Sequence, residues 1–230
     1  MNTRQLFDQD TGTYTYLIWD EESGEAAIID SVREQFERDS NLIIELGLTL
    51  KYTLETHVHA DHVTASGLLR DEFDATVVLH KNSESRCADL LVDDGDQVQL
   101  GEQVIEMIHT PGHTNTDITY KVDEMLFTGD TLLIRGCGRT DFQSGDADTL
   151  YSSITEKLFT LDDNTIVYPG HDYIGRTVSS IGEEKRLNPR LAHTSREEFI
   201  AIMDGLVLDP PKRIKESVPG NLACGLKAAA

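Results

Sequence analysis

The side chains best suited to metal chemistry lie in one short stretch, residues 56–62. It contains four candidate ligands, His57, His59, Asp61 and His62. Strand-like alternation precedes the stretch at 50–55 and helical spacing follows it at 62–72, so we expect a turn between a strand and a helix. Imidazole and carboxylate ligands suit zinc, iron or manganese, and the lack of a thiolate argues against a cysteine-rich structural zinc site. The alternative is a solvated, histidine-rich loop.

Three more candidate ligands follow later, each in a loop after a predicted strand: His113, Asp130 and His171. Taken singly, His113 could be a core histidine and Asp130 a turn residue. Their recurrence at strand ends favours another interpretation, because strands that end at one edge of a sandwich bring distant residues together. The sequence therefore predicts one metal site built from residues more than a hundred positions apart.

The predicted elements alternate in the first half of the chain and form a meander in the second. The first half is expected to contain strands 14–19 and 26–30, helix 34–47, strand 48–55, helix 62–72 and strand 76–79. The meander is expected at 97–100, 103–109, 117–122 and 125–128. Helix 148–161, strand 165–168 and helices 183–187 and 195–206 follow, the last opening with a capping box at Ser195. This succession is typical of a layered α/β fold.

The length and the net charge of the chain limit the functions that it could have. The 230 residues suffice for a single domain, 1–230, whose core needs no metal in order to fold, so a bound metal would serve chemistry. The 20 basic and 41 acidic side chains give a formal net charge of −21, which makes nucleic acid and membrane surfaces poor partners. An anionic substrate would need arginines at its pocket.

The cysteines and the N-terminus both predict a cytoplasmic protein. Cys87, Cys137 and Cys224 are odd in number and lack C-x-x-C spacing, so we expect reduced thiols rather than a disulfide framework. Residues 1–8 lack the apolar segment of a secretory signal. No apolar run is long enough to predict a transmembrane helix.

The order and spacing of the candidate ligands resemble the metallo-β-lactamase superfamily. The chain carries H-x-H-x-D-H at 57–62, then a Gly-His ending at His113, a Gly-Asp ending at Asp130 and a Gly-His ending at His171. The resemblance implies an α/β (α+β) fold of the αββα sandwich type, with two mixed β-sheets flanked by helices and a metal site at one edge. It does not choose the reaction, since members include thioesterases, lactonases, nucleases, flavodiiron oxidoreductases and persulfide dioxygenases.

Three further stretches resemble one branch of that superfamily, the ETHE1-type persulfide dioxygenases. They are residues 133–143, 168–173 and 187–191, and the likeness extends over nearly the whole chain. It implies a mononuclear Fe(II) bound by His57, His113 and Asp130, a facial triad that leaves coordination positions open. The implied reaction oxidises glutathione persulfide with O2 to sulfite and glutathione.

The resemblance also implies roles for the other candidate ligands. Asp61 and His171 would act in catalysis by orienting the metal ligands through hydrogen bonds. With His59 and His62, they form either this hydrogen-bonding set or a second metal site. A second metal would make the chain a glyoxalase II-type hydroxyacylglutathione hydrolase, and a non-enzymatic metal sensor is a third class.

The substrate pocket is assigned by the same resemblance. Arg139, Tyr173 and Arg190 are implied to contact glutathione, and a C-terminal helical segment at about 174–230 is implied to contribute to the pocket. Arg139 has a structural alternative, which is to pair with Asp141 and fix its own loop. A homodimer and a functional link to a rhodanese-type sulfurtransferase are compatible with the resemblance.

Overall fold

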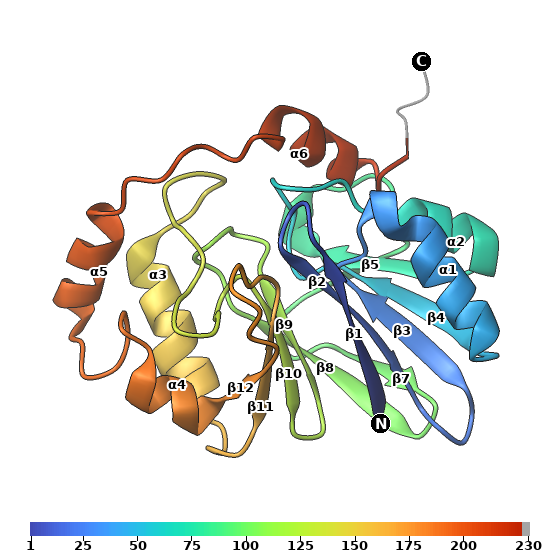
Figure 1. The fold of residues 1–230 in the computed structure, drawn as a ribbon, viewed down its shortest axis with the longest axis horizontal. Helices are drawn as coiled ribbons and strands as arrows, with labels where there is room; N and C mark the ends of the chain where they lie inside the picture. Colours follow the sequence, from blue (N-terminus) through green and yellow to red (C-terminus); the bar gives the residue numbers. More distant parts are fainter. Residues whose placement is uncertain (227–230) are drawn as a thin grey trace.

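Two six-stranded β-sheets pack face to face in the computed structural model, which describes residues 1–226 (Figure 1). The first sheet, in spatial order, contains β1 (Asn2–Asp8), β2 (Thr13–Trp19), β3 (Glu25–Ile29), β4 (Thr49–Leu54), β5 (Thr76–His80) and β6 (Leu90–Val92). The second contains β7 (Gln97–Leu100), β8 (Gln103–His109), β9 (Ile118–Val122), β10 (Met125–Gly129), β11 (Ile166–Pro169) and β12 (Ser179–Ser180). Both sheets are mixed, since β3 to β6 are parallel in the first and β10 and β11 in the second.

Helices cover the outer faces of both sheets (Figure 1). Helices α1 (Phe36–Glu45) and α2 (Ser66–Phe73) lie on the first sheet, and α3 (Ala147–Ser152), α4 (Ile181–Leu187) and α5 (Arg196–Asp204) lie on the second. A last helix, α6 (Ile214–Leu222), packs on β5 and on the turn after β4. The predicted αββα sandwich is therefore confirmed.

The largest core lies between the two sheets. Its fully buried side chains include Tyr16 and Leu54 from the first sheet and Tyr120 and Phe127 from the second. Burying large apolar side chains stabilises a fold by roughly 1.5–3 kcal/mol each, so this layer keeps the two sheets in one relative position. It thereby fixes the relative position of loops that leave different sheets.

The structure differs from the predicted elements mainly around the site. Helix α2 begins at Ser66 rather than at residue 62, because residues 57–65 follow an irregular path before the helix starts. Strands β1, β6 and β12 and helix α6 were not predicted. Pro219 lies inside α6 and is followed by Gly220, both poor helix formers, so this segment lacks a helical signal.

Helix α3 is shorter than predicted and begins one residue earlier than its expected first residue. The side chain of Asp146 caps it by accepting a hydrogen bond of 2.7 Å from the Thr149 amide. A π-helical turn (Ser153–Lys157) and a 3-10 turn (Leu158–Thr160) continue the same path. The capping box at Ser195 is confirmed at the start of α5.

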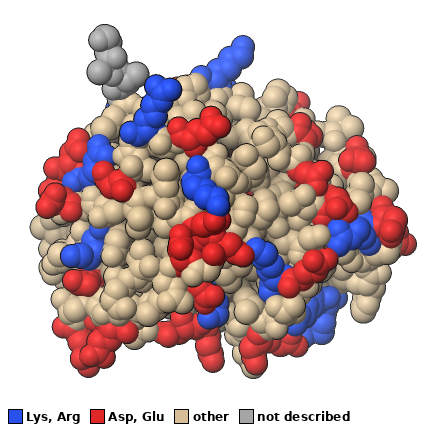
Figure 2. Space-filling view, turned by 180° about the vertical axis from the view of Figure 1, so that it is seen from behind, with Lys and Arg blue, Asp and Glu red and all other residues tan. Residues whose placement is uncertain are grey.

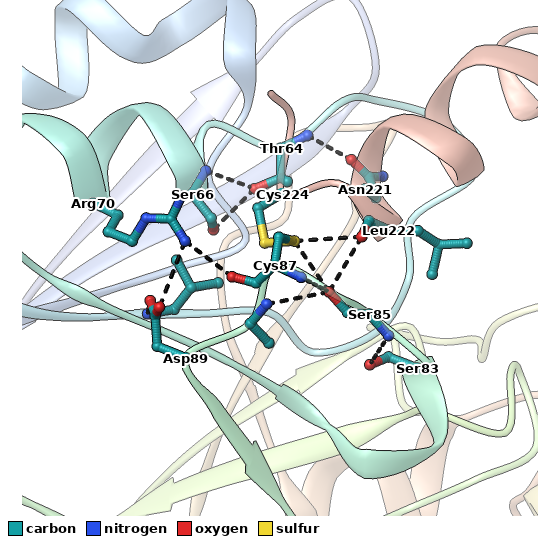
Figure 3. Close-up of a disulfide and its surroundings, with 12 residues drawn as sticks. Thr64, Ser66, Arg70, Ser83, Ser85, Cys87, Asp89, Asn221, Leu222 and Cys224 are labelled. Carbon is teal, nitrogen blue, oxygen red and sulfur yellow. Dashed lines mark hydrogen bonds and ion pairs between the residues drawn. A yellow bond between two sulfur atoms is a disulfide. The ribbon is translucent and has the colours of Figure 1, made fainter. Parts of the chain in front are cut away.

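The prediction of three reduced thiols is wrong for two of the cysteines. Cys87 and Cys224 form a disulfide that joins positions 137 residues apart (Figure 3). Sequence spacing does not reveal such a pair, because α6 is what brings Cys224 beside Cys87. Cys137 is a buried free thiol that packs 3.7 Å from the Met203 sulfur, as expected for a packing residue. The cysteine argument for a cytoplasmic location therefore no longer holds.

The surface agrees with the strong acidity of the sequence. Figure 2 shows acidic side chains over much of one face, with basic side chains interspersed among them. Within the described residues, no helix is long and apolar enough to cross a membrane. Residues 227–230, the end of the segment assigned to the substrate pocket, lie outside the described residues.

The disulfide is expected to stabilise the fold. A cross-link over 137 residues restricts the unfolded chain, so Cys87→Ser should lower the free energy of unfolding by about 2–5 kcal/mol in chemical denaturation. Reducing the unmodified protein should give the same shift, whereas a Cys137→Ala variant should keep its sensitivity to reductant. A count of three free thiols in the protein unfolded without reductant would contradict the pairing.

Candidate metal centre

The predicted ligands meet at one end of the sandwich, where strands of both sheets end. His57, Asp61, His113, Asp130 and His171 line a common cavity of about 460 Å³. They come from the turn after β4, the loop between β8 and β9, and the loops after β10 and β11. The strand ends therefore converge at one edge of the sandwich, as the sequence predicted.

His57, His113 and Asp130 form one group of candidate ligands on the cavity wall. One ligand atom of each lies within 4.8 Å of the others. The rings of His57 and His113 are nearly perpendicular, with centroids 4.9 Å apart, and His113 Nε2 lies 3.6 Å from Asp130 Oδ2. Two imidazoles and one carboxylate in this arrangement form the donor set of a facial-triad metal site.

A backbone carbonyl fixes the orientation of His113. Its Nδ1 donates a hydrogen bond of 2.7 Å to the Arg139 carbonyl oxygen, which leaves the lone pair on Nε2, the atom that faces Asp130. The approach of this loop requires a glycine, because a Cβ on Gly138 would lie 2.7 Å from His113 Cγ. The Gly138 amide also donates to the Asp130 carbonyl at 2.6 Å. One loop thus braces two of the three ligands.

A buried side-chain relay fixes His57. The Thr56 hydroxyl donates to Asp30 Oδ2 at 2.8 Å, so its oxygen is left to accept the Nδ1 hydrogen of His57 at 3.0 Å. The free lone pair is then on Nε2, as in His113. Burial, together with the neighbouring His59 and His113 rings, lowers the pKa of His57 well below its usual value, which keeps the ring neutral as a metal ligand must be.

His171 lies between two carboxylates. Its Nδ1 is 2.6 Å from Asp130 Oδ1, and its Nε2 is 3.0 Å from Asp61 Oδ2. Burial disfavours the charged ring, but Asp130 and Asp61 outweigh it and raise the pKa of His171 well above its usual value. Burial likewise opposes ionisation of Asp130, yet His171 and the other rings hold the Asp130 pKa well below its usual range. His171 therefore occupies one oxygen of Asp130 and leaves Oδ2 for a metal.

His59, Asp61 and His62 form a second group with ligand atoms within 4.8 Å of one another. Nε2 of His59 is 3.1 Å from Asp30 and 3.2 Å from Glu55, and these carboxylates raise the pKa of His59 well above its usual value despite burial. Nδ1 of His62 is 2.9 Å from Asp61. The other ring nitrogens, His59 Nδ1 and His62 Nε2, are buried without a hydrogen-bond partner among the described residues, so this group could accept a second cation.

A third cluster, away from the cavity, is a poorer metal site. His80 and His109 stack with centroids 4.0 Å apart, and Asp93 lies beside them. Nδ1 of His80 accepts the Asn82 amide hydrogen at 3.2 Å, so the ring hydrogen is on Nε2, 3.6 Å from Asp93 Oδ1. Neither nitrogen of His80 thus offers a lone pair to a metal, because Nδ1 accepts a hydrogen bond and Nε2 carries the ring hydrogen.

The three predicted substrate residues all line the cavity. Arg139 directs its guanidinium to Asp141 with two contacts of 2.6 Å and lies over the Phe142 ring, as the structural alternative expected. Arg190 donates to the Cys137 carbonyl at 2.8 Å. Tyr173 is 75% exposed at the cavity mouth, with its ring parallel to that of His171.

The C-terminal segment also reaches this cavity. Leu208, Asp209 and Pro211 line it, and the Asp209 carbonyl accepts a hydrogen bond of 2.7 Å from Arg139. The contact ties the segment to the loop that braces the metal ligands. Its role in substrate binding stays a prediction.

Sequence reasoning missed several residues that support the site. Thr13 contacts both Asp61 and His171, Thr56 and Asp30 hold His57, and Asn221 binds the backbone of the metal turn. Asp30 could have been found, because it is the last residue of a predicted strand and the candidate ligands also lie at strand ends. Thr13 and Asn221 carry no such signal.

Comparisons with known proteins agree with this geometry. The model of the metallo-beta-lactamase superfamily matches residues 9–171. The human mitochondrial persulfide dioxygenase ETHE1 is 49% identical over 226 residues, which cover 97% of this chain and 89% of the human protein. The crystal structure of ETHE1 from Myxococcus xanthus is 56% identical with a TM-score of 0.96, covering 98% of this chain and 100% of that one. A hydroxyacylglutathione hydrolase of Rhizobium meliloti is 37% identical over 172 residues, 73% of this chain and 65% of the hydrolase.

The fold and the ligand set, together with these matches, define a member of the metallo-β-lactamase superfamily. Within that superfamily the chain belongs to the persulfide dioxygenases, which are oxidoreductases. The assignment made from residues 133–143, 168–173 and 187–191 is confirmed.

The relay to His57 can be tested by mutation. Thr56→Val removes the hydroxyl that accepts the Nδ1 hydrogen, so metal affinity should fall about 10- to 100-fold, the usual cost of losing a group that orients a metal ligand. Chelator competition measures this affinity. Thr53→Val is the matched control, because the Thr53 hydroxyl is buried on β4 and has no hydrogen-bond partner within residues 1–226. Equal affinities for the two variants would contradict the relay.

Proposed function

We propose that the chain oxidises the terminal sulfur of glutathione persulfide with O2 at a single Fe(II) held by His57, His113 and Asp130. Glutathione persulfide, O2 and water would give glutathione, sulfite and two protons, with four electrons passing from sulfur to O2. The observation that carries the proposal is the donor set at the cavity wall, with two imidazoles and a carboxylate oxygen facing an open space of about 460 Å³. The near full-length similarity to persulfide dioxygenases supports the same substrates.

The residues present fit a ferrous ion of this kind. Nε2 of His57 and His113 are left with lone pairs by their Nδ1 hydrogen bonds, and Asp130 keeps Oδ2 toward the cavity. Fe(II) at such a triad supplies vacant coordination positions and the electrons that activate O2. The protein contributes the orientation of the three ligands and the placement of the substrate.

Asp61 and His171 would act by positioning rather than by bonding to substrate. His171 holds Asp130 through Nδ1, and Asp61 holds His171 through Nε2. Because the ring lies between two carboxylates, it stays protonated and keeps both contacts. This pair would maintain the angle at which Asp130 presents its free oxygen.

The substrate would enter past Tyr173 with its carboxylates toward the arginines. Glutathione is anionic, and the chain carries a formal net charge of −21, so local positive charge is needed at the mouth. Arg190 and Arg139 supply it, although Arg139 is already paired with Asp141. Arg139 would therefore mainly shape the cavity wall, where its backbone carbonyl accepts the hydrogen bond from His113.

The alternative function is hydrolysis of a hydroxyacylglutathione thioester by two metals. It is supported by the His59–Asp61–His62 group, with its two buried and unpartnered ring nitrogens, and by the similarity to the Rhizobium meliloti hydrolase. Two metals could activate a bridging hydroxide for attack on a thioester. The two functions share the first metal position and differ at the second.

Location and partners remain predictions. A homodimer and a rhodanese-type sulfurtransferase that delivers the persulfide are both compatible with the open cavity mouth.

Oxygen uptake tests the proposed reaction. Protein loaded with iron under anaerobic conditions should consume O2 when glutathione persulfide is added and should release sulfite in equal amount. His113→Ala removes a ligand and should reduce uptake to the background rate. Uptake by the unmodified protein no faster than by this variant would overturn the proposal.

Metal analysis separates the two functions. We expect about one iron per chain, and Asp130→Asn should weaken iron binding at least about tenfold more than His59→Ala, because only the first removes a ligand charge. Equal losses, or two bound metals per chain, would instead support the hydrolase.

A further inference from the structure

The side chain of Asn221 binds the metal turn from the last helix of the chain. Asn221 is 3% exposed on α6, which sequence reasoning did not predict. Its Nδ2 donates to the carbonyl oxygens of His59 and His62, each at 2.9 Å, and its Oδ1 accepts the Thr64 amide hydrogen at 2.8 Å (Figure 3 shows the last contact). Both amide hydrogens and the carbonyl of one side chain are thus used on a single turn.

These contacts replace the bonds of regular secondary structure. Residues 57–65 belong to neither β4 nor α2, so their main-chain groups depend on other partners. The two carbonyls that Asn221 binds flank Asp61 in sequence. Asn221 therefore sets the path of the backbone that presents Asp61 to His171.

Helix α6 is firmly anchored at this position. The Cys87–Cys224 disulfide joins its end to the segment before β6 (Figure 3), and the Gly67 amide donates to the Cys224 carbonyl at 2.8 Å. Val218 and Leu222 pack with Val58, a residue of the metal turn itself. The anchor gives Asn221 a fixed base from which to hold the turn.

A continuous series of contacts then leads to a metal ligand. The turn places Asp61, Asp61 Oδ2 binds His171 Nε2 at 3.0 Å, and His171 Nδ1 binds Asp130 Oδ1 at 2.6 Å. A shift of the turn would change the contact between Asp61 and His171, and so the orientation of Asp130.

We infer that Asn221 is a positioning residue of the metal centre, which acts through the backbone of the turn and the Asp61–His171 pair to orient Asp130. The inference rests on the proposed function for the identity of the metal ligands. It assigns to α6 a role in metal binding in addition to its packing on β5 and on the metal turn. Among the described residues, no other side-chain hydrogen bond joins the C-terminal end to the turn between His59 and Thr64.

The test compares three variants, with Co(II) as a spectroscopic probe of the site. Asn221→Ala removes all three hydrogen bonds. Asn221→Asp keeps the shape and the acceptor for Thr64 but cannot donate to the His59 and His62 carbonyls. Ser217→Ala is the matched control, because Ser217 is also buried on α6 and its hydroxyl has no hydrogen-bond partner in the part of the chain that the structure describes.

Three properties are measured for each variant: Co(II) affinity by chelator competition, the visible absorption spectrum of the Co(II) protein, and the unfolding temperature. Both Asn221 variants should lose about tenfold or more in affinity and show a shifted spectrum, whereas Ser217→Ala should match the unmodified protein. Where Asn221→Ala does not fold, Asn221→Asp carries the test.

A folded Asn221→Asp protein with unchanged affinity and spectrum would overturn the inference and leave Asn221 a structural residue, whatever its unfolding temperature. The proposed function would survive that result. Failure of the unmodified protein to bind Co(II) at all would overturn both.

Discussion

Two hydrogen bonds donated by histidine Nδ1 atoms decide whether this site can hold a metal. His113 donates to the Arg139 carbonyl, and His57 donates to the Thr56 hydroxyl, whose own hydrogen is engaged by Asp30. Each bond selects the tautomer with a lone pair on Nε2 and fixes the direction of the ring. The loop around Arg139 consequently serves two purposes, since it forms a wall of the cavity and also orients a ligand.

Three of the buried histidines of the site, His57, His59 and His171, fall into two electrostatic classes. His59 lies between Asp30 and Glu55, and His171 lies between Asp61 and Asp130, so carboxylates raise the pKa of both rings above the usual value despite burial. Burial instead lowers the pKa of His57, which faces other imidazoles. The charged rings of His59 and His171 neutralise buried acids, whereas the neutral ring of His57 can bind a metal. His57 and His59 belong to different classes although they lie in the same H-x-H-x-D-H motif.

The charge of these histidine rings bears on how many metal ions the site could hold. An imidazolium between two carboxylates already compensates charge that a second cation would otherwise neutralise, which agrees with a mononuclear centre. The second group nevertheless retains unpartnered nitrogens on His59 and His62. The two candidate functions thus use the same residues of this chain and differ in whether the second group holds a cation.

The sequence by itself determined the candidate ligands and the family, because strand ends in a sandwich converge and the spacing of His57, His113 and Asp130 places each one just after a strand. It did not reveal the disulfide, the extent of α6 or the role of Asn221. Cys87 meets Cys224, and Asn221 meets the metal turn, across more than a hundred residues, through a helix that contains a proline. Only the tertiary structure decided these features, since hydrogen bonds to an irregular backbone depend on where two segments meet in space and leave no periodic pattern in the chain.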